Sequence, residues 1–80
     1  MRIVYVSLPT PHDVQAFVGK ISPLDGQFDL LANGYVLDAK SLMGIFGLDL
    51  TKPLKLRIEK DTKETMQAVK RFLVEEKLSL

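Results

Sequence analysis

The stretch that decides the fold reads Asn33-Gly34-Tyr35-Val36-Leu37-Asp38-Ala39-Lys40-Ser41-Leu42-Met43-Gly44-Ile45-Phe46-Gly47. Asn-Gly between two apolar-rich runs is a strong hairpin signal, because a type I′ turn needs a positive φ at both central residues. Ser41 suits the start of a short helix, since its hydroxyl can accept from a backbone N–H that has no partner within the helix. Gly47 can adopt the left-handed conformation that ends a helix. The stretch therefore predicts a hairpin that leads directly into a helix of one or two turns.

This short helix carries four large apolar residues, and one buried stripe cannot hide them all. We expect Leu42, Met43 and Phe46 to form a partly exposed patch that contacts a protein partner, because clustered exposed apolar side chains usually mark a contact site. In the simpler interpretation they belong to the core. Ser41 stands at the positive end of the helix, where a phosphate is favoured, and we interpret it as a candidate site of regulatory phosphorylation. In the simpler interpretation it is only a helix cap.

The other elements follow from hydrophobic spacing on either side of this stretch. Residues 3–8 and 54–59 have the composition or alternation of strands, and residues 27–32 and 35–39 form the two arms of the hairpin. Apolar residues three, four and seven positions apart predict a helix from Asp13 to about Ile21. A last helix follows Asp61, which we expect to be its N-cap with Glu64 as the capping-box partner. Its expected inner, apolar stripe consists of Met66, Val69 and Leu73, joined by Phe72.

The predicted order is β-α-β-β-α-β-α, which indicates an α+β domain. We expect an open-faced sandwich in which helices cover one face of a four-stranded, mainly antiparallel sheet. At 80 residues, the chain is predicted to be one domain over 1–80. The first and last helices should supply most of the core, with the Ser41 helix on the rim.

Composition argues against several kinds of function. The net charge of +1 gives no strong field toward nucleic acid or a membrane surface. Without cysteine, and with a single histidine, the chain has no disulfide and no ligand set typical of structural zinc. We expect no metal, no cofactor, no nucleic-acid partner and no membrane insertion. The short apolar run at the start is not typical of a signal peptide, so a cytoplasmic location is expected.

The element order, together with Asn33-Gly34-Tyr35-Val36-Leu37-Asp38-Ala39-Lys40-Ser41-Leu42-Met43-Gly44, resembles the HPr family. Members of this family are small phosphoryl carriers of the bacterial sugar phosphotransferase system. They typically show Asn-Gly, a strand, and then Lys-Ser-Ile/Leu-Met-Gly at the opening of a short second helix. The resemblance covers essentially the whole chain, and its most specific part lies between Asn33 and Gly47. It implies an HPr-like fold, and in many relatives from Gram-positive bacteria the serine that matches Ser41 is the target of a regulatory kinase.

The resemblance also implies a phosphoryl acceptor, because the family phosphorylates a histidine at the start of its first helix, in a pattern similar to Gly-Ile-His-Ala-Arg-Pro-Ala. The matching stretch is Thr10-Pro11-His12-Asp13-Val14-Gln15-Ala16. His12 matches the acceptor, but Val14 stands in place of the family's arginine and Gln15 in place of its proline. The phosphate would therefore lack a guanidinium, and Asp13 adds a negative charge nearby. Phosphoryl transfer through His12 should be weakened.

Three functions remain open. The first is an HPr-like phosphocarrier, at most a phosphoryl relay and not a turnover enzyme, in which His12 accepts phosphate from an Enzyme I-like donor and passes it to a sugar-transporter component. The second is a regulatory binding module similar to the catabolite-repression relatives of HPr, which acts through Ser41 and the patch of Leu42, Met43 and Phe46 without phosphorylation of His12. The third is a scaffold or subunit without phosphate chemistry.

Overall fold

A computed structural model describes residues 1–75 of the chain; residues 76–80, which belong to the predicted domain, lie outside the described residues. Nine elements follow one another: β1 (Arg2–Val6), α1 (Pro11–Ile21), β2 (Phe28–Ala32), β3 (Tyr35–Asp38), α2 (Leu42–Ile45), β4 (Leu54–Ile58), α3 (Lys63–Val69), a 3₁₀ turn η1 (Lys70–Phe72) and β5 (Leu73–Val74). The predicted order is confirmed as far as α3, and the turn and β5 are additions to it.

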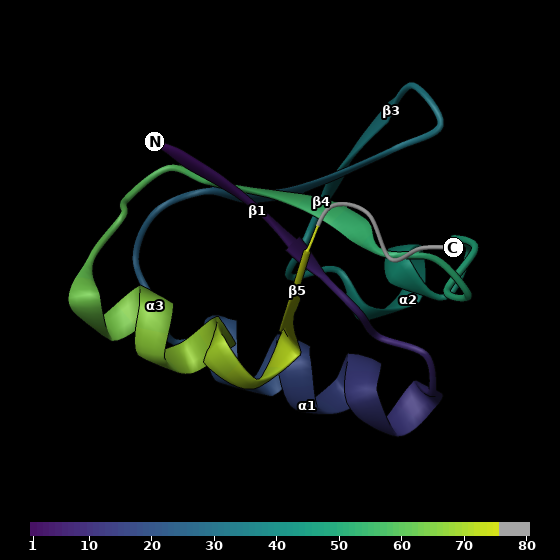
Figure 1. The fold of residues 1–80 in the computed structure, drawn as a ribbon, viewed down its shortest axis with the longest axis horizontal. Coiled ribbons are helices and arrows are strands. Elements are labelled where there is room, and N and C mark those ends of the chain that lie inside the picture. The colour runs from purple at the N-terminus through teal and green to yellow at the C-terminus, as the bar shows by residue number, and fades with distance from the viewer. Residues whose placement is uncertain (76–80) are drawn as a thin grey trace.

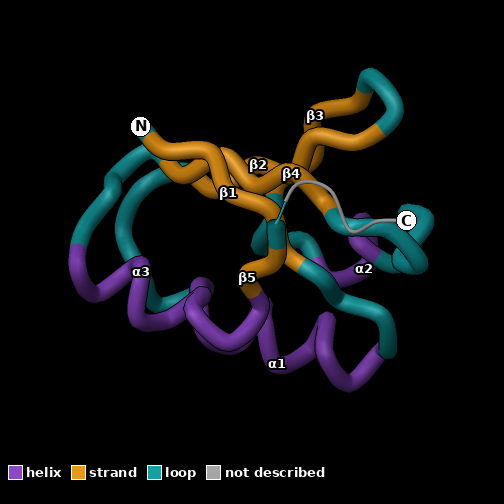
Figure 2. Tube along the Cα trace, viewed as in Figure 1, coloured by secondary structure: helices purple, strands orange, loops and turns teal. Residues whose placement is uncertain are grey.

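The sheet has five strands in the order β3-β2-β4-β1-β5, and every neighbouring pair is antiparallel. Figures 1 and 2 show α1 and α3 together on one side of this sheet, while no helix of the described chain covers the other side. The predicted α+β class and the one-sided layer of helices are therefore correct. The predicted number of four strands is wrong, because β5 adds a fifth strand at the edge beside β1.

The fifth strand arises because the last helix ends earlier than its apolar spacing suggests. The helix stops at Val69, and the chain tightens into the 3₁₀ turn before Leu73 and Val74 pair with Val6 and Tyr5. Two contacts of Phe72 fix the chain at the turn between α3 and β5. Its ring packs edge-to-face on Phe17, with 5.4 Å between the ring centroids, and its carbonyl accepts from the Ser7 N–H at 2.9 Å. Tertiary packing outweighs the helical periodicity here.

The prediction that Asp61 caps α3 is also wrong. The N-cap is Thr62, whose side-chain oxygen accepts from the backbone N–H of Thr65 at 3.1 Å. Asp61 instead forms an ion pair with Arg2, with 2.8 Å between Oδ2 and Nε. Both residues are good caps, and the pairing of β1 with β4 brings Arg2 close to Asp61. A local pattern could not reveal this contact.

The hairpin and the start of α2 are confirmed. Asn33 and Gly34 have φ values of 52° and 81°, as a type I′ turn requires, and Ser41 is the N-cap of α2. The prediction for Gly47 is wrong, since its φ is not positive. Its N–H bonds to the carbonyl of Gly44 at 3.1 Å, so the helix tightens at its end without a left-handed residue.

The core lies between the sheet and the helices. It consists of fourteen buried apolar residues: Val6, Leu8, Val14, Phe17, Ile21, Phe28, Leu30, Ala39, Ile45, Leu54, Leu56, Ile58, Val69 and Phe72. Alternate residues of β4 are buried, as predicted for a strand with one wet face. The prediction that the first and last helices supply most of the core is wrong. Of the fourteen core residues, α1 supplies three and α3 one, whereas β1, β2 and β4 together supply six. Within residues 1–75, no helix has the length and apolar content to cross a membrane.

Candidate functional site

The first helix begins with a complete capping box. Thr10 is the N-cap, Pro11 takes the first helical position, and Asp13 takes the third. The Thr10 side-chain oxygen accepts from the Asp13 N–H at 3.1 Å, and the Asp13 carboxylate accepts in return from the Thr10 N–H at 3.2 Å. This sequence therefore fixes where the helix starts and which residues surround its positive end.

His12 lies at the second position of this helix, and it is exposed. Pro11 has no N–H, and the capping box uses the N–H groups of Thr10 and Asp13, so among residues 10–13 only the His12 N–H has no hydrogen bond within the described structure. An anion on the His12 side chain would face the positive end of the helix dipole. The His12 imidazole is therefore accessible from outside the protein, beside the positive end of the helix.

Val14 stands at the sequence position where the HPr pattern has an arginine, but its side chain points into the core. Its side chain is fully buried in the core, and it stands two residues after His12, which places it on the opposite side of the helix. A guanidinium at position 14 could not reach a phosphate on His12 without breaking the core. Gln15 is exposed and stands three residues after His12, so these two residues are neighbours on the helix surface.

Ser41 and its helix form the second candidate region. The Ser41 hydroxyl oxygen accepts from the Gly44 N–H at 3.4 Å, and the side chain is half-buried. Gly44 stands in a crowded position, because an added Cβ would lie 2.7 Å from Cδ1 of Leu37. The helix is therefore held closely against β3.

The three residues of the predicted patch divide between core and surface. Leu42 is half-buried and packs against the core, whereas Met43 is 79% exposed and Phe46 is 37% exposed. Ile45 is the buried residue of this helix. The exposed apolar surface on α2 thus consists of Met43 and Phe46, with Leu42 at its inner border.

The two candidate regions belong to neighbouring elements. Helices α1 and α2 contact each other, and in Figure 1 the start of α1 and the whole of α2 lie toward the same end of the long axis. The structure thus brings His12 and the Ser41 region to the same end of the molecule, on separate elements.

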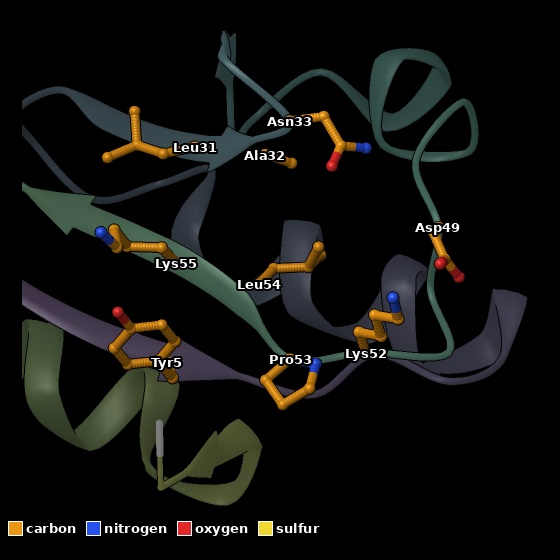
Figure 3. Close-up of a pocket in the computed structure, with 9 residues that line it drawn as sticks. All are labelled: Tyr5, Leu31, Ala32, Asn33, Asp49, Lys52, Pro53, Leu54 and Lys55. Carbon is orange, nitrogen blue, oxygen red and sulfur yellow. The ribbon is translucent and has the colours of Figure 1, made fainter. Parts of the chain in front are cut away.

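A hollow of about 250 Å³ lies elsewhere, and none of the predicted site residues lines it (Figure 3). It is bounded by β1, β2, the start of β4 and the chain before β4, with the following residues around it: Tyr5, Leu31, Ala32, Asn33, Asp49, Lys52, Pro53, Leu54 and Lys55. Hydrogen bonds from the Thr51 side chain and backbone, together with the charge of Lys52, lower the pKa of Asp49. Sequence reasoning missed this hollow because its walls come from segments far apart in the chain.

Lysine 40, the residue before the Ser41 cap, has a structural contact of its own. Its Nζ donates to the Leu24 carbonyl at 2.6 Å and lies 5.4 Å from the centre of the Phe28 ring. The Lys40 ammonium group thus connects the loop after α1, which contains Leu24, to the chain just before α2. This use of Lys40 gives the Lys-Ser pair a role in holding the fold together.

The described residues offer little to a metal ion. In residues 1–75, no three side chains of histidine, cysteine, aspartate or glutamate come together in a group that could bind one. At the start of α1, the groups available for chemistry are the His12 imidazole, the Asp13 carboxylate and the His12 backbone N–H. No protein-family model and no curated protein matches this sequence.

Proposed function

We propose that this protein is an HPr-like phosphoryl carrier of the phosphoenolpyruvate-dependent sugar phosphotransferase system, with His12 as the acceptor. The observation that carries the proposal is the placement of His12. It is exposed at the second position of α1, between Thr10 and Asp13, whose capping box fixes the helix start. The sequence of the hairpin and Ser41 region, which resembles the HPr family, supports the same function.

In this function, a neutral imidazole nitrogen of His12 attacks the phosphorus of a phosphorylated donor protein. A P–N bond to His12 forms while the bond between phosphorus and the donor breaks, and the phosphoryl group later leaves to a sugar-transporter component in the same way. The His12 N–H, which the capping box does not use, and the positive end of the helix dipole stabilise the transferred group. With Val14 buried and no guanidinium in the first turn, this relay should be slower than one that has an arginine there.

The test is phosphoryl transfer from phosphoenolpyruvate through Enzyme I of the same host, followed by intact mass at alkaline pH. The chain has a single histidine, so an alkali-stable, acid-labile phosphate reports on His12 alone. We expect a gain of one phosphate in the parent and none in His12→Ala. An ordinary HPr in the same mixture is the positive control. If that control gains phosphate and the parent does not, the carrier proposal is wrong.

A second function is favoured by the exposed surface of α2. Met43 and Phe46 are apolar and accessible, and they lie on the helix that Ser41 caps. In this alternative, the protein is a regulatory binding module, and phosphorylation of Ser41 changes its affinity for a regulatory protein. A phosphate there would place two negative charges beside an apolar contact surface.

This alternative is tested by binding to a purified regulatory protein or transporter component of the same system. Ser41→Asp should change the affinity, and Met43→Ser should weaken it. The matched control is Ile3→Ser, which removes an apolar side chain that is 51% exposed on β1. Equal binding by Met43→Ser and Ile3→Ser, with no effect of Ser41→Asp, would contradict a docking role for α2.

A further inference from the structure

We propose that two copies of this chain associate through the free edge of β3, in an antiparallel pair centred on Val36. This inference is independent of the proposed phosphoryl transfer. In the sheet order, β3 is an edge strand, and among residues 1–75 its only strand partner is β2. The β2–β3 hairpin rises from the rest of the sheet, away from α1 and α3 (Figures 1 and 2).

The hairpin register fixes which backbone groups point outward. In a two-residue hairpin, the pair that flanks the turn exchanges both hydrogen bonds, and here this pair is Ala32 and Tyr35. The next pair along, Leu31 and Val36, is of the type without hydrogen bonds between its members. The N–H and C=O of Val36 therefore point away from β2, toward the free edge.

The far end of the strand is already occupied. The Asp38 carbonyl accepts from the Ser41 N–H at 3.0 Å, and its carboxylate accepts from the Lys40 N–H at 2.9 Å. The part of the edge that can accept a new strand is thus centred on Val36 and not on Asp38.

The edge also lacks the features that usually prevent pairing. Edge strands are commonly protected by lysine, proline or a bulge, and β3 contains neither of these residues and pairs with β2 without a bulge. Instead it exposes two large apolar side chains, Tyr35 at 72% and Val36 at 63%.

A second copy fits this edge because the strand is self-complementary. When Val36 faces Val36 of the second copy across a twofold axis, the two residues exchange both hydrogen bonds. Tyr35 then lies opposite Leu37 of the other chain, and Asp38 lies opposite Gly34, so no like charges face each other. At about 3.3 Å per residue, the two Asp38 residues stand roughly 13 Å apart, beyond the screening length of about 8 Å at physiological salt.

A register centred on Leu37 fits less well. It would place Val36 opposite Asp38 of the second copy and would require the Asp38 carbonyl, which the Ser41 N–H already occupies. The Val36 register also extends the apolar row of Leu31 and Val36 across both copies on the open face of a continuous sheet.

The experiment is sedimentation velocity over a wide range of protein concentration, combined with amide hydrogen exchange at Val36. Val36→Pro removes the outward N–H, which β2 does not use, and proline is tolerated where an edge N–H faces solvent. Val36→Thr keeps the N–H and the branched shape and is the matched control. Tyr35→Lys places a charge on the edge and provides a second, independent disruption; circular dichroism verifies that each variant is folded.

We expect a concentration-dependent dimer in the parent and in Val36→Thr, with slower exchange at Val36 as the concentration rises. The dissociation constant should increase at least tenfold in Val36→Pro and in Tyr35→Lys. A parent that remains monomeric at every concentration overturns the proposal, and so does a dimer that neither disrupting variant weakens. Dimerisation without slower exchange at Val36 places the interface elsewhere and overturns it as well.

Discussion

The Asp13 carboxylate accepts two hydrogen bonds from Thr10, one from the Thr10 backbone N–H at 3.2 Å and one from the Thr10 hydroxyl at 2.8 Å. This contact holds a negative charge at the start of α1, one residue from His12. The positive end of the helix is thus partly neutralised before any phosphate arrives. The residue that stabilises the helix start therefore opposes the reaction proposed for His12.

Replacing Asp13 with asparagine should accelerate phosphoryl transfer to His12 while it keeps a side-chain oxygen at the capping position. In water, a unit charge about 6 Å away contributes about 0.7 kcal/mol, so its removal should raise the initial rate roughly threefold. The measurement is the rate of phosphate incorporation from a phosphorylated donor. Asp25→Asn, which changes an exposed carboxylate in the loop after α1, is the control. A rate that is unchanged in Asp13→Asn would contradict the opposing effect of this charge.

A guanidinium can be restored at position 15, where the side chain is exposed and neighbours His12 on the helix surface. Gln15→Arg should raise the rate of phosphate acceptance and slow the loss of phosphate, whereas Gln15→Glu should do the reverse. Both rates are measured with the same donor and followed by intact mass. If the two substitutions of opposite charge have the same effect, the phosphate on His12 does not lie over this face of α1.

The same guanidinium at position 14 should unfold or strongly destabilise the protein. Val14 is fully buried, and an unpaired charge in the core ranks among the most destabilising substitutions. We expect Val14→Arg to lower the free energy of unfolding by at least about 3 kcal/mol, against a change within about 0.5 kcal/mol for Gln15→Arg. Urea denaturation of the two variants and the parent measures the difference, and equal stabilities would show that position 14 is accessible.

Local patterns predicted much of this fold because local geometry determines those parts. The Asn33-Gly34 turn needs two positive φ values, and the Ser41 cap satisfies a neighbouring N–H, so both could be inferred from adjacent residues. The contact of Asp61 with Arg2, by contrast, joins residues far apart in the chain. The same holds for Phe72, which turns the end of the last helix into a strand by packing on Phe17.

In the candidate sites, too, adjacent residues predicted the local structure, whereas burial depends on contacts between segments far apart in the chain. Sequence reasoning placed His12 at a helix start, where the structure also has it, but it could not show that Val14 faces the core while Gln15 faces outward beside His12. Exposure of Met43 and Phe46 was expected because a short helix has one buried stripe, but which residue would be buried depends on how α2 lies against β3. The assignment of His12 and Ser41 as functional residues stays a prediction.

Replacement of glycine by alanine should change the free energy of unfolding in opposite directions at two positions. At Gly44, a Cβ would lie 2.7 Å from Cδ1 of Leu37 and 3.1 Å from the Ser41 hydroxyl oxygen, so Gly44→Ala should lower the free energy of unfolding by about 1 kcal/mol. At Gly19, on the exposed side of α1, a Cβ meets nothing within 4 Å. Gly19→Ala should raise the free energy of unfolding by about 0.5 kcal/mol, since alanine favours the helix. Urea denaturation compares the two, and a gain in stability at Gly44 would show that α2 can move away from β3.

The ion pair of Asp29 with Arg57 should make stability depend on pH in acid. Burial by itself would raise the pKa of Asp29, but hydrogen bonds from Gln27 and Arg57 and the Arg57 charge outweigh it, and the pKa is lowered. The contact between Arg57 Nη2 and Asp29 Oδ2 is 2.9 Å, with the aspartate side chain 14% exposed. A carboxyl with a lower pKa in the folded state stabilises the protein above its unfolded pKa of about 3.9, and this contribution is lost as the pH falls through the folded value.

Asp29→Asn should therefore destabilise the protein at pH values above about 4 and matter progressively less below that pH. The free energy of unfolding of parent and variant, measured in urea at a series of pH values from neutral to strongly acidic, gives the difference directly. Asp25→Asn, at a carboxylate for which no ion pair with another described residue is found, is the matched control and should show a smaller pH-dependent difference. A parent-to-variant difference for Asp29 that stays constant as the pH falls would mean that the charge of Asp29 does not stabilise the fold.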